Sequence, residues 1–502
     1  MNGTEALLTE SVEAPEMAEA REILPPAIAP AKRPGPARGA NPGLQSLFRV
    51  IWRWHFYAGV IIAPVLVVMS VTGGLYIFKA EIEEFARRDL LFVTPGPSRV
   101  TYQAQVDAAL AAHPGTMPAQ IQVHNDPDRA TIITLRPARR PGEAPPQGRE
   151  GFRSQVNVYV NPYDGKILGQ LGGASALNSF FQTILSIHRT LWAGTTGRVI
   201  TELATSWSIV LVVTGVYLWW PRKKAKAAGV WTLRWKAKLY TLLRDLHSVG
   251  GIYLMPICAT ILVTGMFYTL AVGTVIHKAA HEWVGEDEPA AEAPRSKGER
   301  GPRPDAVAAQ RPPAPPSLPL DTLIGTMRER FPDRILMASL GEGRGRRGAA
   351  AKSGPSNGMM ISAGNDFNRT YGPMVGTSVT LDKSTGKVLA EKDNSQMEFF
   401  WHQWTYPLHV GSFWGLATKI PWLIACVVLT ILPITGLWMW WERRPKGRSG
   451  LPRRPDVRVP AWLIGVIAVL GVFLPVMGAS VVLILLGEAA YGLVRRDLSP
   501  AA

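Results

Sequence analysis

Four histidines occupy matching positions in two halves of the chain, and their placement is the first indication of chemistry. His55 begins the apolar stretch HFYAGVIIAPVLVVMSVTG (55–73), and His247 begins HSVGGIYLMPICATILVTG (247–265). In both stretches a glycine follows the histidine after four residues, a proline follows after nine, and VTG ends the stretch. A single histidine at such a position is most often an interfacial residue or a polar helix contact. The repetition is therefore the informative feature.

The other two histidines repeat a second pattern. IHRTLWAG, which contains His188, leads to VVTGVYLWWPR, and LHVGSFWG, which contains His409, leads to PITGLWMWWERR. His188 precedes Thr214 by 26 residues, and His409 precedes Thr435 by the same number. Agreement at so many offsets indicates that the chain contains two copies of one unit.

Histidines placed in this way can act as metal ligands. Two copies of equal orientation predict a pseudo-two-fold axis along the membrane normal, which puts His55 and His247 at one depth and His188 and His409 at another. Two imidazoles that face each other across an axis can supply the fifth and sixth ligands of a non-covalently bound haem iron. Ionisable groups at membrane depth are costly and usually functional, so four histidines in two levels favour ligands over interfacial residues. We therefore predict two haem b groups.

Glycines lie where a porphyrin needs space. Gly59 and Gly251 follow their histidines by one helical turn. The TG of the first and third apolar stretches lies 17 residues from its histidine, about 25 Å along a helix. Gly73 and Gly265 should thus reach the depth of the outer histidine pair, and by the same reasoning Gly215 and Gly436 approach the inner pair. Small residues also serve ordinary helix packing in membranes, and both roles remain open.

The remaining candidate sites are weaker. His402 lies seven residues before His409, and Phe181 takes its place in the first half. We interpret His402 as a candidate contact for a substrate or for the metal of the outer site. His277 and His281 have the i, i+4 spacing of a metal pair, but no third ligand is evident and a surface position is expected. GRGRRG (343–348) matches GxGxxG formally, but lacks the preceding strand and following helix that a dinucleotide site requires.

Five apolar blocks must position these residues. They cover 54–78, 199–220, 248–271, 419–441 and 461–487. Apolar residues gathered in such blocks, in a chain that is 47% hydrophobic, predict a multi-pass α-helical membrane protein. The last block is either one long kinked span or two short segments broken at Pro475.

The outer segments also repeat. VYVNPYDGKILGQ (158–170) resembles VTLDKSTGKVLAE (379–391), and each predicts a strand, a glycine turn and a second strand. The predicted fold is a two-fold repeated four-helix core in which each copy consists of a span, an α/β periplasmic domain, a histidine segment and a span. One or two further membrane segments follow it at the C-terminus.

These patterns divide the chain into ten segments. They are a disordered cytoplasmic tail (1–46), the first span (47–79), a first periplasmic domain (80–175), a histidine segment with the second span (176–221), a basic cytoplasmic loop (222–246), the third span (247–276), a second periplasmic domain with low-complexity inserts (277–393), a histidine segment with the fourth span (394–441), a second basic loop (442–459) and a C-terminal membrane segment (460–496).

Charge sets the expected orientation. The net charge of +16 is concentrated beside the spans, where loop 221–244 has no acidic residue and loop 442–458 is nearly as basic. Lys and Arg resist translocation, so both loops and the N-terminus should be cytoplasmic and the long segments outside, which in a bacterium means the periplasm. The basic excess therefore needs no nucleic-acid partner.

Cys258 and Cys426 lie within spans and no CxxCH occurs. The sequence therefore predicts neither a disulfide framework nor covalently attached haem.

The motifs together resemble a known family. VYVNPYDGKILG and VTLDKSTGKVLA look like PepSY domains, and the series H-x3-G…VTG, LH…G…TGxxLWWPR and RDLHSVGG is similar to the PepSY-associated transmembrane family of bacterial inner-membrane proteins. The similarity covers roughly 45–445 outside the inserts. Members of that family include iron-regulated proteins and di-haem ferric-siderophore reductases. The resemblance therefore implies that the haem ligands of this chain are His55, His188, His247 and His409. Some relatives are fused to a flavin reductase domain that this chain lacks, which implies a separate electron donor.

We therefore expect a b-type cytochrome that passes electrons from a cytoplasmic flavin reductase or a quinol to a periplasmic ferric siderophore or other ferric chelate, and so releases Fe(II). A first alternative is a non-enzymatic PepSY membrane anchor, which senses envelope state or regulates a peptidase. A second alternative is a transporter of iron complexes. Against it we note that the spans lack the buried acidic residues that proton-coupled pumps often use.

Overall fold

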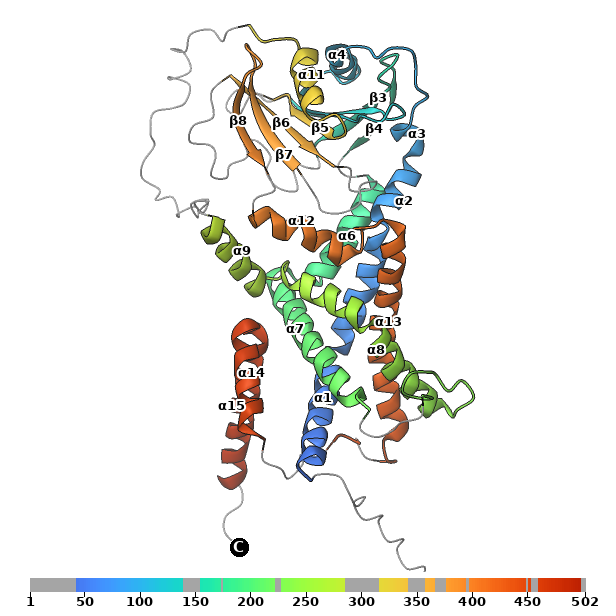
Figure 1. Ribbon diagram of the computed structural model, residues 1–502, viewed down its shortest axis with the longest axis vertical. Coiled ribbons are helices and arrows are strands. Elements are labelled where there is room, and N and C mark those ends of the chain that lie inside the picture. The colour runs from blue at the N-terminus through green and yellow to red at the C-terminus, as the bar shows by residue number, and fades with distance from the viewer. Residues whose placement is uncertain are drawn as a thin grey trace, which may run out of the picture.

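The computed structural model describes residues 42–138, 154–172, 175–221, 227–284, 316–341, 357–365, 376–393, 397–447, 450–452 and 459–497. The GRGRRG motif and nearly all of the expected N-terminal tail lie outside these residues. Figure 1 shows three parts: a β-sheet domain at one end, a bundle of long helices below it, and a pair of helices beside the bundle.

Four helices of the described chain are long and apolar enough to cross a membrane. They are α1 (Pro42–Ile77), α7 (Gly194–Trp219), α8 (Leu239–Met266) and α13 (Leu416–Arg443). At 1.5 Å per residue the shortest of them is about 39 Å long, which exceeds the roughly 30 Å of a bilayer's hydrocarbon core. The chain is thus a multi-pass membrane protein.

These helices pack as a closed four-helix bundle. Both α1 and α8 pack against α7 and against α13, so α1 and α8 stand at opposite corners. Between α8 and α13 the interior is apolar, with Cys258, Ala425 and Leu429 buried together. Outward-facing residues are also apolar: Ile61 is 68% exposed and Val213 is 65% exposed. An apolar exterior is expected of helices surrounded by lipid.

The fifth apolar block forms two helices, α14 (Ala461–Phe473) and α15 (Pro475–Asp497), which lie side by side in Figure 1. The chain reverses at Leu474, and the two helices approach closely because a Cβ at Gly478 would lie 2.5 Å from the carbonyl oxygen of Gly471. With 13 residues, α14 is about 20 Å long and too short to span a bilayer alone. Of the two alternatives for this block, the structure has two separate segments.

The strands of both outer segments form one sheet, shown at the top of Figure 1. The first segment supplies β1 (Thr116–Val123), β2 (Thr131–Pro137), β3 (Val156–Val160) and β4 (Ile167–Gly172), and the second supplies β5 (Ile335–Ser339), β6 (Gly358–Gly364), β7 (Gly376–Asp382) and β8 (Val388–Asp393). The order is β4-β3-β2-β1-β5-β6-β7-β8, with antiparallel neighbours throughout. The sequence predicts two periplasmic domains, whereas in the structure β1 pairs with β5 and joins them. This pairing removes an exposed edge from each half.

Helices α4 (Tyr102–Ala112) and α11 (Leu320–Arg330) cover one face of the sheet. The alternating strand residues Ile121, Ile133 and Leu336 are completely buried beneath them. The backbone N–H of Tyr102 donates to Asp321 at 2.7 Å and so links one covering helix to the other. One hydrophobic core therefore serves both outer segments.

The segments with the outer histidines form two helices between the sheet and the bundle, α6 (Ala176–Thr190) and α12 (Met397–Val410). On the N-terminal side the chain passes from α1 to the sheet through α2 (Lys79–Ala86) and α3 (Arg88–Leu91). Helix α9 (Ala271–Val284) extends from the top of α8. The C-terminal ends of α6 and α12 place His188 and His409 next to the bundle.

Buried acidic residues in α7 and α8 correct the expectation that the spans carry none, because Glu202 in α7 and Asp245 in α8 are both completely buried. Glu202 has partners outside its own helix. Its carboxylate accepts hydrogen bonds from the backbone N–H groups of Ala271 and Val272, at 2.8 and 3.1 Å, where α9 begins. A carboxylate at a helix N-terminus satisfies N–H groups that lack a partner within the helix. Glu202 therefore anchors α9 to the bundle.

The turn from α6 to α7 depends on close backbone approach. Leu191 and Trp192 have φ values of 45° and 60°, which are unusual for residues other than glycine. A Cβ at Gly197 would lie 1.6 Å from the carbonyl oxygen of Thr190. Only glycine fits at position 197 without separation of the two backbones, and this contact sets how α6 presents His188.

We predict that Gly197→Ala lowers the unfolding temperature of the detergent-solubilised protein. The added methyl group must displace backbone, which costs about 2 kcal/mol or more. Gly325→Ala in α11 is the control, because a Cβ there meets no atom within 4 Å and alanine favours a helix by about 1 kcal/mol over glycine. Equal unfolding temperatures for Gly197→Ala and the wild type would contradict the close approach.

Candidate functional site

The four histidines predicted as ligands form two pairs in the structure. His55 on α1 and His247 on α8 face each other across the bundle, with ring centroids 6.3 Å apart and ring planes at 78°. His188 on α6 and His409 on α12 form the other pair, also with a centroid separation of 6.3 Å, at 60°. All four side chains are partly buried. We call these the inner pair (His55, His247) and the outer pair (His188, His409).

The separation within each pair suits two ligands of one metal ion. An imidazole nitrogen binds a metal at about 2 Å, and the ring centre lies roughly 1 Å further away. Two imidazoles on opposite sides of one ion therefore have centroids about 6 Å apart. The inner and outer pairs match this geometry. Direct stacking or hydrogen bonding between the two rings would not require this centroid separation.

Hydrogen bonds fix which ring nitrogen of each histidine is available. In every case Nδ1 contacts the threonine of a TG dipeptide on a neighbouring helix: Thr214 at 2.9 Å from His55, Thr72 at 3.1 Å from His188, Thr435 at 3.2 Å from His247 and Thr264 at 3.2 Å from His409. Each threonine hydroxyl donates to a carbonyl of its own helix, four residues earlier. A hydroxyl has one hydrogen to donate, so the threonine accepts and the histidine Nδ1 carries the proton.

Backbone carbonyls support the same assignment. Nδ1 of His188 lies 3.0 Å from the Met69 oxygen, that of His247 lies 2.9 Å from the Leu432 oxygen, and that of His409 lies 3.0 Å from the Ile261 oxygen. A carbonyl can only accept, so Nδ1 must donate. This leaves the Nε2 lone pair free on each ring, as metal-ligating histidines require.

The glycines of the TG dipeptides pack against the histidine rings themselves. A Cβ would lie 3.2 Å from His188 Cε1 at Gly73, 3.1 Å from His409 Cε1 at Gly265, 3.4 Å from His55 Cε1 at Gly215 and 3.5 Å from His247 Cε1 at Gly436. The sequence places these four glycines at the depth of a histidine pair, and the structure has them there. In each TG dipeptide, the threonine thus accepts a hydrogen bond from the histidine ring, and the glycine leaves space for that ring.

The other two glycines have different surroundings. A Cβ at Gly59 would meet no atom within 4 Å, whereas one at Gly251 would lie 3.6 Å from the Leu432 side chain. Neither touches a histidine ring. The sequence predicts that both glycines leave space for a porphyrin. The space beside Gly59 is larger than that beside Gly251.

The two pairs lie at opposite ends of the bundle. Helix α1 carries His55 and also Thr72, which binds His188 of the outer pair. These positions are 17 residues apart in one helix, about 25 Å along its axis. The apolar cluster of Cys258, Ala425 and Leu429 belongs to the bundle core.

Further residues surround the outer pair. The ring of Tyr268 lies 5.7 Å from that of His409, and its hydroxyl donates to Thr405 at 3.3 Å. His402 belongs to α12, but its side chain lies outside the described residues, and its predicted role stays a prediction. Within the described residues, no group of three or more His, Cys, Asp or Glu side chains could hold a metal ion. Paired histidines are thus the candidate metal ligands of this part of the chain.

Sequence reasoning missed the threonines as functional residues. Thr214 and Thr435 define the repeat distance, and Thr72 and Thr264 belong to VTG, so the signal was present in the motif. A residue that hydrogen-bonds a metal ligand sets its tautomer and orientation, and such residues commonly matter almost as much as the ligand.

For the predicted role of the outer pair as haem ligands, we expect Gly265→Ala to weaken the binding of added haem by about tenfold, as is usual when a ligand's support is disturbed. A contact of 3.1 Å forces the His409 ring to move, whereas Gly436→Ala, at 3.5 Å from His247, makes an ordinary van der Waals contact and serves as the control. Absorbance titration of haem into apo-protein measures both. Weaker binding by Gly436→Ala than by Gly265→Ala would contradict the geometry.

Comparisons with known proteins agree with the sequence motifs. The family model described as PepSY-associated TM region matches residues 52–443, which include both histidine pairs, the sheet, most of α1 and the whole of α7, α8 and α13. No curated protein matches the chain. Since the match extends over most of the sequence, the chain belongs to the PepSY-associated transmembrane family.

Proposed function

We propose that the protein is a b-type di-haem electron-transfer protein of a bacterial inner membrane, which reduces a periplasmic ferric chelate such as a ferric siderophore and releases Fe(II). The observation that carries this proposal is the pair of matched histidine sites. Each site has a centroid separation of 6.3 Å. Each also has both Nδ1 atoms bound to acceptors, so that both Nε2 atoms are free.

The residues would divide the work in a simple way. Haem supplies the one-electron redox chemistry when it is bound. The histidines hold it from both sides, the TG threonines fix the ring orientation, and the apolar bundle excludes water. Two sites at the two ends of α1 give electrons a route across most of the membrane's thickness. The sheet above the outer pair would hold the ferric chelate, and reduction would weaken the binding of iron by hard oxygen ligands.

The proposed orientation follows from charge. The loop from α7 to α8 contains Arg234, Lys236 and Lys238, and Arg443 and Arg444 end α13 near the same end of the bundle as the inner pair. Excess basic residues mark cytoplasmic loops. We therefore assign the inner pair and the N-terminus to the cytoplasmic side, and the sheet to the periplasm.

A pseudo-two-fold axis along the membrane normal is also part of the proposal. The strand order is symmetric about the β1–β5 junction. His55 binds α7 as His247 binds α13, and His188 binds α1 as His409 binds α8. Equivalent contacts at equivalent sequence offsets support two copies of one structural unit.

Optical spectra of the purified protein test the assignment. Haem bound by two histidines should give a Soret band and an α-band that sharpens on reduction with dithionite. Alanine at any one of the four histidines should reduce the haem content from two to one, because each pair is independent. A preparation made with haem available that lacks a Soret band would remove the cytochrome proposal and favour the non-enzymatic anchor.

The threonines allow a finer test. Thr214→Val should raise the midpoint potential of the inner haem by roughly tens of millivolts, because a less basic His55 stabilises Fe(III) less and a tenfold shift in relative binding equals about 59 mV. Thr435→Val is the matched variant and should shift it less, since His247 keeps the Leu432 carbonyl at 2.9 Å. Redox titration followed at the α-band gives both values. An equal shift in both variants would contradict the role of the carbonyl.

A further inference from the structure

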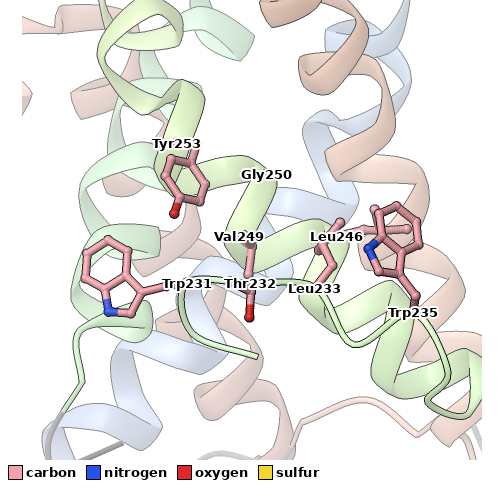
Figure 2. A pocket seen from close by; sticks show the side chains of 8 residues that line it. All are labelled: Trp231, Thr232, Leu233, Trp235, Leu246, Val249, Gly250 and Tyr253. Atoms are coloured by element: carbon pink, nitrogen blue, oxygen red, sulfur yellow. The ribbon is translucent and has the colours of Figure 1, made fainter. Parts of the chain in front are cut away.

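An apolar groove lies on the outside of α8 at the inner end of the bundle. Its volume is about 430 Å³, and its walls are the loop residues Trp231, Thr232, Leu233 and Trp235 and the helix residues Leu246, Val249, Gly250 and Tyr253. Figure 2 shows Tyr253 and Trp231 on one side of it, Leu246 and Trp235 on the other, and Val249 with Thr232 between them. Nothing in the proposed function uses this groove.

Ion pairs hold the loop wall in place. Arg234 donates to Asp245 through Nε and Nη2, both at 2.7 Å, and Arg244 binds the same carboxylate at 3.1 Å. Asp245 is completely buried. A buried carboxylate is costly unless it is fully paired, so the loop cannot leave α8 without a large loss of free energy. The groove is therefore a preformed feature of the fold.

Aromatic contacts secure the other end of the loop. The indole N–H of Trp219 donates to the Val230 carbonyl at 2.9 Å. The rings of Trp219 and Trp231 meet edge to face at 4.7 Å, and Trp231 also lies 6.4 Å from Tyr253. These contacts orient Trp231 along the groove.

The groove offers hydrogen bonds as well as apolar surface. The indole N–H groups of Trp231 and Trp235 and the hydroxyls of Thr232 and Tyr253 belong to exposed side chains, so they are accessible to a ligand. Apolar walls with a few free polar groups are typical of small-molecule sites. Trp and Tyr also gather at membrane interfaces as anchors, but anchors need not line a common hollow.

The position of the groove connects it to the inner pair. Leu246 precedes His247, and Val249 and Gly250 follow it on the same helix turn. The groove and the inner pair therefore share one turn of α8. The exposed Tyr253 and Val263, at 59% and 49%, lie further along α8 on its lipid-facing side. A ligand that is dissolved in the membrane therefore reaches the groove without crossing the protein.

We propose that this groove binds a membrane-dissolved hydroquinone, which is the electron donor of the proposed function. Its ring fits between aromatic side chains, its two hydroxyls match the accessible indole and hydroxyl groups, and its apolar tail stays in lipid. Oxidation breaks both O–H bonds and gives the quinone, two protons and two electrons. The protons leave to solvent at the loop wall, which is basic and carries Lys236 and Lys238 directly after the groove residues in sequence. The inner pair, His55 and His247, would hold the haem that accepts these electrons one at a time, and two electrons suffice for two ferric chelates.

Two measurements on the purified full chain test this inference, which rests on the proposed function for the fate of the electrons. Photolabelling with an azidoquinone, followed by peptide mapping, should mark residues 231–253 and be prevented by excess unlabelled quinone. Stopped-flow mixing with a short-chain quinol should produce the reduced α-band. Both Thr232→Trp, which fills the groove, and Trp231→Ala, which removes a wall, should slow reduction by about tenfold, the effect of losing one packed aromatic contact.

The controls separate the two proposals. Trp462→Ala removes an interfacial tryptophan of α14 that is 60% exposed and outside the groove, and should behave as wild type. Unchanged dithionite spectra of the groove variants show that they are folded. If dithionite reduces the haem but the quinol does not, the hydroquinone site alone is overturned. Wild-type rates of reduction by quinol in Thr232→Trp would overturn it as well. Absence of haem would overturn the proposed function. Photolabelling only of residues outside 231–253 would refute the hydroquinone site, whether or not haem is present.

Discussion

The hydrogen bond from a histidine Nδ1 to a threonine on the next helix is the contact on which the arrangement depends. It occurs four times and joins α1 to α7, α6 to α1, α8 to α13 and α12 to α8. Such bonds between membrane helices contribute only about 1 kcal/mol each, so they do not account for the stability of the bundle. Their effect is directional. They fix the Nδ1 side of each ring, and they make the position of every candidate ligand depend on the packing of two helices.

Part of this arrangement could be read from the sequence. The equal offsets of the two halves indicate which histidines share a depth, and the structure brings those residues together. Equal spacing in helices of regular rise converts directly into equal depth, which is why this inference is possible without a structure. The role of these residues as ligands stays a prediction. The threonines were overlooked because a hydroxyl within an apolar span has several ordinary roles, including bonds to its own helix.

Other features could not be read from the sequence because they depend on long-range pairing. Each outer segment has strand patterns of its own, and nothing local indicates that β1 would choose β5 as its neighbour. The burial of Glu202 was missed for a similar reason, since its partners are N–H groups of α9, about 70 residues away. The break at Leu474 was one of two readings of the same block, and the contact between Gly471 and Gly478 that accompanies it appears only in three dimensions.

The junction of β1 and β5 has a mechanical consequence. Residues 120–123 pair with 336–339 in register, in the middle of an eight-stranded sheet with one continuous core. Transporters built from two repeats commonly work by rocking one repeat against the other, which opens a path alternately to each side of the membrane. Here such rocking would break the hydrogen bonds between β1 and β5 and split the packed core that both halves share. The sheet therefore joins the two halves rigidly, which fits the proposed electron transfer better than transport by rocking.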